Sequence, residues 1–261
     1  MVGHIQVYNI GFDARRTGDI INVDTRTIGY RRRCGECPAR PDVHTIKQYP
    51  EREEPTMKVL LINGSPHEAG NTAAALDEME AVFRREGIEV TRVSIGKECV
   101  RGCIACYNCY KTGKCIFDDV VNRIAPLFEA CDGLVVASPV YYASANATLV
   151  ACLDRLFYST HFDKRMKVGA AVAAARRGGL TSTFDELNKY FAISGMPIAS
   201  GQYWNGIHGR EPGEAQGDAE GLQMMRTLAE NMTFLMRSIA LGRERYGLPT
   251  PEPRVSTNFI R

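Results

Sequence analysis

The sequence predicts a doubly wound α/β fold, in which helices cover both faces of a parallel sheet. Short apolar runs such as 58–62 and 134–137 alternate with longer segments whose apolar residues recur every three or four positions. Five strand–helix units of this kind follow one another from Met57 onward. Consecutive units in this order form a parallel sheet with right-handed crossovers, so the pattern predicts the fold class.

The predicted strands differ in how much of each is buried. Residues 58–62 and 134–137 are continuous apolar runs, typical of strands covered on both faces, whereas 88–95 mixes charged and β-branched residues and predicts an edge strand. Residues 139–144 are expected to form a loop. The remaining predicted elements are strands at 168–175 and 197–203 and helices between 71 and 87, at 118–131, at 145–158, around 184–191 and over the last long segment.

The last helix carries an apolar stripe. Its apolar residues lie three and four positions apart, so they share one face of the helix. That face is expected to contact either the sheet or another subunit. The residues concerned are Met225, Leu228, Met232, Leu235 and Ile239.

Composition narrows the class of partner. A net charge of +2 over 261 residues gives no basic field for nucleic acid or for an acidic membrane surface. The uncharged stretch 133–153 is interrupted by polar residues and Pro139, which argues against a membrane span. No charged segment followed by an apolar one opens the chain, so a cytoplasmic protein acting on a small molecule or a protein partner is expected.

Residues 1–56 differ from the rest of the chain. Apolar residues are scattered without period among Arg, Pro, Gly and Asp, which predicts an irregular or disordered extension, or an upstream start that the cell does not use. Cys34 and Cys37, with His44, are the beginning of a zinc-knuckle pattern, but one cysteine pair is weak support for zinc. Residues 57–261 are the predicted folded domain.

The loop after the first strand has the chemistry of a phosphate site. In open α/β sheets the ligand lies at the carboxyl ends of the strands, where the strand order reverses. Residues 64–72 there are Gly-Ser-Pro-His-Glu-Ala-Gly-Asn-Thr, with small residues, two hydroxyl side chains and a following helix whose amino end is positive. The spacing is not that of the dinucleotide fingerprint, which favours a monophosphate. An ordinary strand-to-helix turn capped by Asn71 or Thr72 is the alternative.

The loop after the third predicted strand supplies a flat surface. Residues 138–144, Ser-Pro-Val-Tyr-Tyr-Ala-Ser, place two adjacent tyrosines at a strand end that faces the ligand. Packing beneath the next helix is the alternative role for these rings.

These segments resemble a known family. Through INGSPHEAGNT, SPVYYASANATLVACLDR and DAEGLQMMRTLAENM, the chain from Met57 onward is similar to the flavodoxin-like NADPH-dependent FMN reductases and iron–sulfur flavoproteins. The resemblance covers about 200 residues in consistent order. It implies a flavodoxin-like, doubly wound, five-stranded parallel sheet of order 2-1-3-4-5, with FMN as cofactor and NAD(P)H as co-substrate.

The resemblance also implies which residues contact FMN. His67 stands where the family often has Arg or Lys, and Ala143 where Gly is common, so these two contacts depart from the family pattern. Residues 176–179, Arg-Arg-Gly-Gly, match the family's third flavin loop; Arg176 there would face reduced flavin or a nicotinamide phosphate, or be a solvated turn charge. The implied contacts are Ser65, His67, Gly70, Asn71 and Thr72 for the phosphate, and Pro139, Val140, Tyr141, Tyr142, Ser144, Arg176, Gly178 and Gly179 for the rest of the flavin.

A compact cysteine group follows the second predicted strand. Cys103, Cys106, Cys109 and Cys115 supply four thiols with gaps of two, two and five residues, a run that resembles the ligands of a [4Fe–4S] cluster more than the two separated pairs of structural zinc. Cys99 with the next two cysteines has radical-SAM spacing, but that chemistry belongs to another fold. Packing without metal is the further alternative. Cys131 and Cys152 lie in apolar segments that are predicted to be helical, and they are expected to be buried thiols.

Two functions are compatible with these features. The first is an NAD(P)H-dependent flavin oxidoreductase that reduces a quinone, a flavin or another small acceptor, with chemistry carried by the cofactor. The second is an electron carrier that exchanges electrons with a redox protein such as ferredoxin. A homodimer or homotetramer is expected for either, from the stripe on the last helix and from the resemblance.

Overall fold

The computed structural model describes residues 56–257 and 259, and their core is a parallel sheet of order β2-β1-β3-β5-β6. The strands are β1 Lys58–Asn63, β2 Glu89–Ser94, β3 Gly133–Tyr141, β5 Val168–Ala175 and β6 Gly206–His208. A further strand, β4 Ser144–Ala145, pairs antiparallel with the end of β3 and lies off this path. The predicted five-stranded order 2-1-3-4-5 is therefore confirmed once β4 is set aside.

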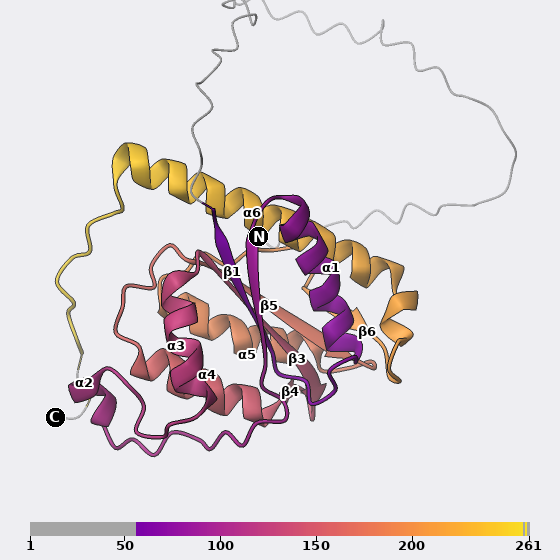
Figure 1. Cartoon of the computed structure of the whole chain (residues 1–261), viewed down its shortest axis with the longest axis horizontal. Coiled ribbons are helices and arrows are strands. Elements are labelled where there is room, and N and C mark those ends of the chain that lie inside the picture. Colours follow the sequence, from indigo (N-terminus) through magenta and orange to yellow (C-terminus); the bar gives the residue numbers. More distant parts are fainter. Residues whose placement is uncertain (1–55, 258, 260–261) are drawn as a thin grey trace, which may run out of the picture. The chain divides into compact units, whose positions relative to one another are not determined.

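Helices cover both faces of the sheet (Figure 1). One apolar core joins the sheet to α1 Asn71–Arg85 and α6 Ala219–Tyr246, and the other joins it to α3 Val120–Ala130, α4 Ala147–Ser159 and α5 Leu180–Ile193. The remaining helical segments are short, α2 Asn108–Thr112 in the cysteine loop and η1 Glu214–Gly217 before α6.

Alternation along β1 shows how one strand serves both cores. Val59 and Leu61 belong to the core beneath α1 and α6, whereas Leu60 and Ile62 belong to the opposite core. Each of these side chains is 1% exposed or less, which explains why the run is apolar without interruption. At β2, by contrast, Arg92 and its neighbours are only partly buried, as expected for an edge strand.

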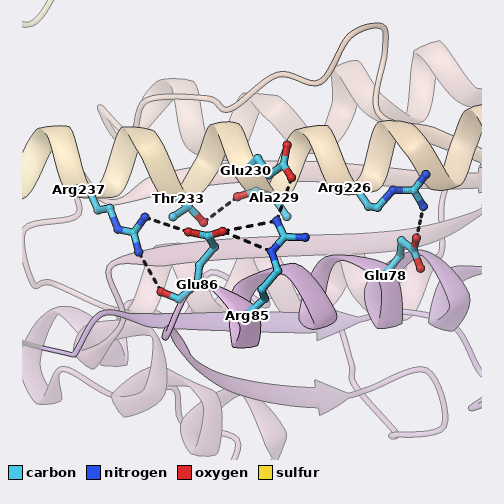
Figure 2. A network of polar contacts seen from close by, with 8 residues as sticks. All are labelled: Glu78, Arg85, Glu86, Arg226, Ala229, Glu230, Thr233 and Arg237. Atoms are coloured by element: carbon cyan, nitrogen blue, oxygen red, sulfur yellow. Dashed lines mark hydrogen bonds and ion pairs between the residues drawn. The ribbon is translucent and has the colours of Figure 1, made fainter.

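The stripe on α6 packs inside the chain. Met225, Leu228 and Met232 are fully buried in the core shared with α1, and Leu235 and Ile239 pack against its border. Of the two expected partners for this face, the sheet with α1 is the one observed. Ion pairs between the helices, including Arg85 with Glu230, flank the apolar contact (Figure 2).

The loop prediction for residues 139–144 is wrong in part. β3 continues to Tyr141 and folds back on β4 through Tyr142 and Ala143, whose φ angles are 51° and 59°. Positive φ at both central residues is the geometry of a type I′ turn, which suits the twist of a hairpin but is ordinarily carried by Asn or Gly. The pair Tyr-Ala gives no such signal, so the hairpin was missed.

The predicted strand at 197–203 is also wrong. Only a single bridge joins Ile198 to Gly169, and the strand forms later, at Gly206–His208. Between Ile198 and β6, the side chain of Asn205 takes the place of backbone pairing. Its Nδ2 donates to the Ala171 carbonyl at 3.1 Å, and its Oδ1 accepts from the Gly201 N–H at 3.0 Å. The chain bulges at this point because a side-chain amide occupies the acceptor on β5.

Within the described residues, no helix combines the length and the apolar character that a membrane crossing requires. The predicted extension, with Cys34, Cys37 and His44, lies outside the described residues apart from Thr56.

Candidate flavin and cysteine sites

The loop between β1 and α1 is folded by its own side chains. Asn63 Oδ1 accepts from the Ser65 N–H at 3.0 Å, and Ser65 Oγ accepts from the His67 N–H at 3.1 Å. Ser65, Gly70 and Thr72 are buried, while the His67 side chain is exposed. Asn63 Nδ2 is buried without a hydrogen-bond partner, which leaves an unused donor behind the loop.

Helix α1 begins without a side-chain cap. Its N-cap is Gly70, which offers no side-chain acceptor to the first N–H groups of the helix. Helices α3, α4 and α6 are instead capped by Asp119, Asn146 and Asp218. An anion is the partner that an open, positively polarised helix end prefers.

A close backbone approach holds this loop in place. A Cβ on Gly96, which follows β2, would lie 2.1 Å from the Ser65 carbonyl carbon, so only glycine fits there. The tight contact joins the end of β2 to the loop between β1 and α1. It also brings the start of the cysteine segment to the edge of the same site.

The hairpin after β3 and the loop after β5 touch. A Cβ on Gly179, whose φ is +88°, would lie 2.7 Å from Ala143 Cα. Ser182 Oγ donates to the Ala143 carbonyl at 2.6 Å, and Glu186 accepts from Ser144 Oγ at 2.8 Å. The left-handed residues of the hairpin are thus fixed by α5, which leaves Tyr142 fully exposed and Tyr141 43% exposed.

The structure brings a further loop, residues 209–217, to this edge. Asn71 Oδ1 accepts from the Ala215 N–H at 3.1 Å, so this predicted phosphate ligand also anchors η1. Backbone N–H groups of Arg210 and Glu211 lower the pKa of Glu214, and nearby Arg210 and Arg176 lower it further. This loop was not predicted because the fifth strand was expected at residues 197–203. The available signal was His208-Gly-Arg210, which directly follows a short apolar pair and could have indicated the end of a strand.

The four predicted cysteine ligands surround one pocket. Cys103 and Cys106 are exposed, Cys115 is half-buried and Cys109 is buried, and all four line the same cavity. Ala105 and Tyr107 have φ of 50° and 56°, so the chain turns sharply between successive cysteines. Helix α2 within this loop was not predicted.

The thiols do not converge on one metal position in this conformation. Across the described residues, no group of three His, Cys, Asp or Glu side chains is close enough to hold an ion. The donor set nevertheless fits an iron–sulfur cluster, because four thiols and no carboxylate line the cavity.

Arg155, which sequence reasoning missed, fastens the cysteine loop from beneath. It projects from α4, is 1% exposed, and its Nε donates to Cys115 Sγ at 3.2 Å. Burial lowers its pKa, but hydrogen bonds to Asp119 and Cys115 reverse the shift, and the net pKa is raised. An arginine on the apolar stripe of α4, between Cys152 and Ser159, was the available signal.

Cys131 and Cys152 are structural thiols, whereas Cys99 is exposed. Cys131 is 3% exposed and Cys152 fully buried, as predicted. Burial raises the pKa of Cys131 to about 11 and that of Cys152 to about 12. Both therefore stay protonated at neutral pH and behave as small apolar side chains.

The fold and the open helix end define a flavodoxin-like flavoprotein, and comparison with known proteins gives its family. The model of the NADPH-dependent FMN reductase family matches residues 57–209. The chain belongs to this family, and it is a flavin oxidoreductase with FMN as cofactor.

Individual relatives agree. The chain is similar to an iron–sulfur flavoprotein from Methanocaldococcus jannaschii, 32% identical over 191 residues that span 70% of this chain and 99% of the relative. An iron–sulfur flavoprotein from Methanosarcina thermophila is 30% identical over 194 residues, 72% of this chain and 100% of the relative. Among solved structures, RosB with a bound riboflavin-phosphate intermediate has a TM-score of 0.58 at 16% identity, covering 79% of this chain and 94% of that one.

Proposed function

We propose that the chain binds FMN at the carboxyl ends of β1, β3 and β5 and transfers reducing equivalents from NAD(P)H to a quinone, a flavin or another small acceptor. The observation that carries the proposal is the uncapped amino end of α1 behind a closed loop of small residues. Bound FMN would supply the hydride-accepting and electron-transfer chemistry, and the chain would supply its binding and orientation.

The chain's own groups divide the work of binding. Backbone N–H groups at the start of α1, with the Ser65 and Thr72 hydroxyls, hold the phosphate dianion. The β3–β4 hairpin offers its backbone and the Tyr141 and Tyr142 rings to the flat ring system. Gly178, beside which there is open space, allows close approach from the loop after β5, while Gly179 packs against Ala143 of the hairpin. The Glu186 and Ser182 bonds keep that hairpin in its left-handed turn, so the surface is formed before the ligand arrives.

A cationic edge supports use of a phosphorylated nicotinamide. Arg176 and Arg210 both lie near the Glu214 carboxylate, from two different loops at the same end of the sheet. Guanidinium groups match phosphate geometry, so this pair would orient the nucleotide over the flavin. Arg210→Gln should therefore raise the KM for NADPH and leave kcat near that of wild type. Steady-state kinetics measure both constants.

The cysteine loop is proposed to hold a [4Fe–4S] cluster on Cys103, Cys106, Cys109 and Cys115. Four thiols lining one cavity, named iron–sulfur flavoproteins among the relatives, and a buried N–H donor on one sulfur support it. The chain supplies the thiolate ligands and a partly apolar wall around them. Cluster chemistry would add one-electron transfer to the two-electron chemistry of the flavin.

One preparation tests both cofactors. Protein purified without air is expected to contain one FMN per chain, and iron and sulfide at four each per chain after reconstitution. Cys106→Ala should lose the iron and its broad visible absorbance but keep the flavin, since separate loops hold it. Absence of flavin after FMN is added would overturn the flavin site, and absence of iron from reconstituted wild type would overturn the cluster.

A second candidate function, electron transfer to a redox protein such as ferredoxin, is favoured by the surface around the cysteines. Ile104, Tyr107 and Ile116 are each about half exposed beside the pocket. Exposed apolar side chains grouped in this way are typical of a surface that contacts another protein transiently. Stopped-flow measurement of flavin reduction by NADPH, with and without reduced ferredoxin, separates the enzyme from the electron carrier. Fast reduction of the flavin by NADPH alone supports the enzyme.

Assembly stays a prediction. Because the apolar stripe of α6 is buried within the chain, the proposed homodimer or homotetramer must use other surfaces, for example the exposed Phe234 and Leu241 on α6. Light scattering at micromolar concentration tests it, and a monomer would contradict it.

A further inference from the structure

The guanidinium of Arg155 has all of its N–H groups engaged. Nη1 donates to Asp119 Oδ2 at 2.7 Å and to the Arg101 carbonyl at 3.2 Å. Nη2 donates to Asp119 Oδ1 at 2.9 Å and to the Phe117 carbonyl at 3.3 Å. The remaining donor, Nε, points at Cys115 Sγ at 3.2 Å. The five donors of an arginine therefore have five partners, one of them a sulfur.

The partners lie on both sides of the cysteine loop. Arg101 precedes Cys103, while Cys115 and Phe117 come at and after the last cysteine. Asp119 is the N-cap of α3, where its Oδ1 also accepts from the Val121 N–H. One buried side chain on α4 thus ties the entry and the exit of the loop to the start of α3.

The sulfur partner is the unusual feature. A neutral thiol is a weak acceptor, and a buried guanidinium gains little from facing one. A metal-bound thiolate carries negative charge and accepts such a bond well. With the Asp119 carboxylate already balancing the guanidinium, the Nε bond directs the remaining positive potential at one ligand of the proposed cluster.

We infer that Arg155 is a positioning residue for the iron–sulfur cluster, which holds the ends of the cysteine loop and, through its N–H···S bond to Cys115, raises the reduction potential. This inference rests on the proposed cluster. Hydrogen bonds to ligand sulfurs stabilise the reduced state, which carries one more negative charge, so they make reduction more favourable. FMN, which other loops hold, should be unaffected.

The test is a redox titration of anaerobically reconstituted protein with dithionite, followed by EPR for the cluster and by absorbance for the flavin. Arg155→Lys keeps the charge and most of the volume but loses the planar fork, and its cluster potential should be more negative than that of wild type while the flavin potential is unchanged. The matched control is Arg101→Gln, which removes an exposed cation next to the loop that has no bond to a cysteine. It should leave the cluster potential close to that of wild type.

A measurement on unaltered protein covers the case in which the variant fails to fold. Pulsed EPR of the reduced cluster in protein labelled with ¹⁵N-arginine should show nitrogen coupled to the unpaired spin through the Nε–H···S bond. No coupling in wild type, or equal shifts in Arg155→Lys and Arg101→Gln, would overturn the role of Arg155 and leave the cluster standing. Reconstituted wild type without iron would overturn both, so the two failures are distinguishable.

Discussion

The two faces of the sheet are both covered by helices, but the residues buried on each face differ in kind. The face beneath α1 and α6 is built from aliphatic residues, methionines and Phe83, and its charges lie at the rim, where the ion pairs of Figure 2 remain partly exposed. The face beneath α3, α4 and α5 contains both structural thiols and, at its edge, Arg155, the one charged side chain that is buried among the described residues.

The difference indicates where function constrains the chain. Desolvating a guanidinium is costly, and a buried ion pair is often no more stable than an apolar replacement, so Arg155 is poorly explained by stability. Its bonds go to Asp119 and to residues at the two ends of the cysteine loop. We interpret the α1–α6 face as the scaffold and the α3–α4 face as the one shaped by a functional loop.

The largest expected effect comes from breaking the buried pair on the functional face. Asp119→Asn keeps an oxygen that can cap α3 but leaves the Arg155 charge without its counter-ion. Removing one partner of a buried pair is strongly destabilising, so the free energy of unfolding should fall by about 3 kcal/mol. Urea unfolding monitored by circular dichroism measures it.

The neighbouring residue supplies the control. Asp118 is exposed and differs from Asp119 by one position, so Asp118→Asn should change the free energy of unfolding by less than about 0.5 kcal/mol. Equal losses in the two variants would show that Arg155 does not depend on its ion pair.

A smaller effect is expected from the thiols on the same face, and it depends on pH. Burial raises the pKa of Cys152 to about 12, whereas the pKa of a cysteine in an unfolded chain is about 8.5. Ionisation then favours the unfolded chain, so the contribution is fully present below about pH 8 and is lost as the pH rises toward 12. Wild type should lose about 2 kcal/mol more than Cys152→Ala between pH 7.5 and 10.

The opposite face gives the matched control for this comparison. Met225→Leu alters a fully buried side chain on α6 that carries no titratable group, so the stability of this variant should fall with pH in parallel with wild type. If Cys152→Ala also runs parallel to wild type, the thiol ionises as readily in the folded chain as in the unfolded one.

Much of the fold was predictable because local pattern and burial agree. The uninterrupted apolar runs of β1 and β5, and the spacing on α6, follow from burial on both faces or along one stripe. The meeting of the predicted site loops was foreseeable from the same pattern, because loops that follow parallel strands lie at one end of the sheet.

The features that escaped prediction depend on single side chains making distant contacts. The Tyr142–Ala143 turn lacks the usual glycine because Ser182 and Glu186, from α5, hold it in place. The strand β6 starts late because the Asn205 amide occupies the Ala171 carbonyl, 34 positions away in sequence. In the sequence, Arg155 is only an interruption of an apolar helix face. Its role becomes visible in the five acceptor atoms that its N–H groups contact.

At the proposed flavin site, the expected effect is on FMN binding rather than on folding. Thr72 is the second residue of α1 and is 2% exposed, and Thr72→Val removes its hydroxyl while keeping its shape. Loss of one hydrogen bond to a charged phosphate should weaken FMN about tenfold, or more, in fluorescence titrations. Thr233→Val, on α6, removes a hydroxyl that donates to Ala229 and should leave FMN affinity unchanged.

The smallest effect is expected on the scaffold face. Glu78 on α1 pairs with Arg226 on α6, but their side chains are 30% and 43% exposed, so water screens the interaction (Figure 2). Glu78→Gln should lower the free energy of unfolding by less than about 1 kcal/mol, and the loss should shrink further in 0.5 M salt. Asp119→Asn, measured in the same two buffers, should keep most of its loss because its pair is shielded from ions. If salt erased both losses equally, the two faces would not differ in how they hold charge, and Arg155 would be a rim residue like the others.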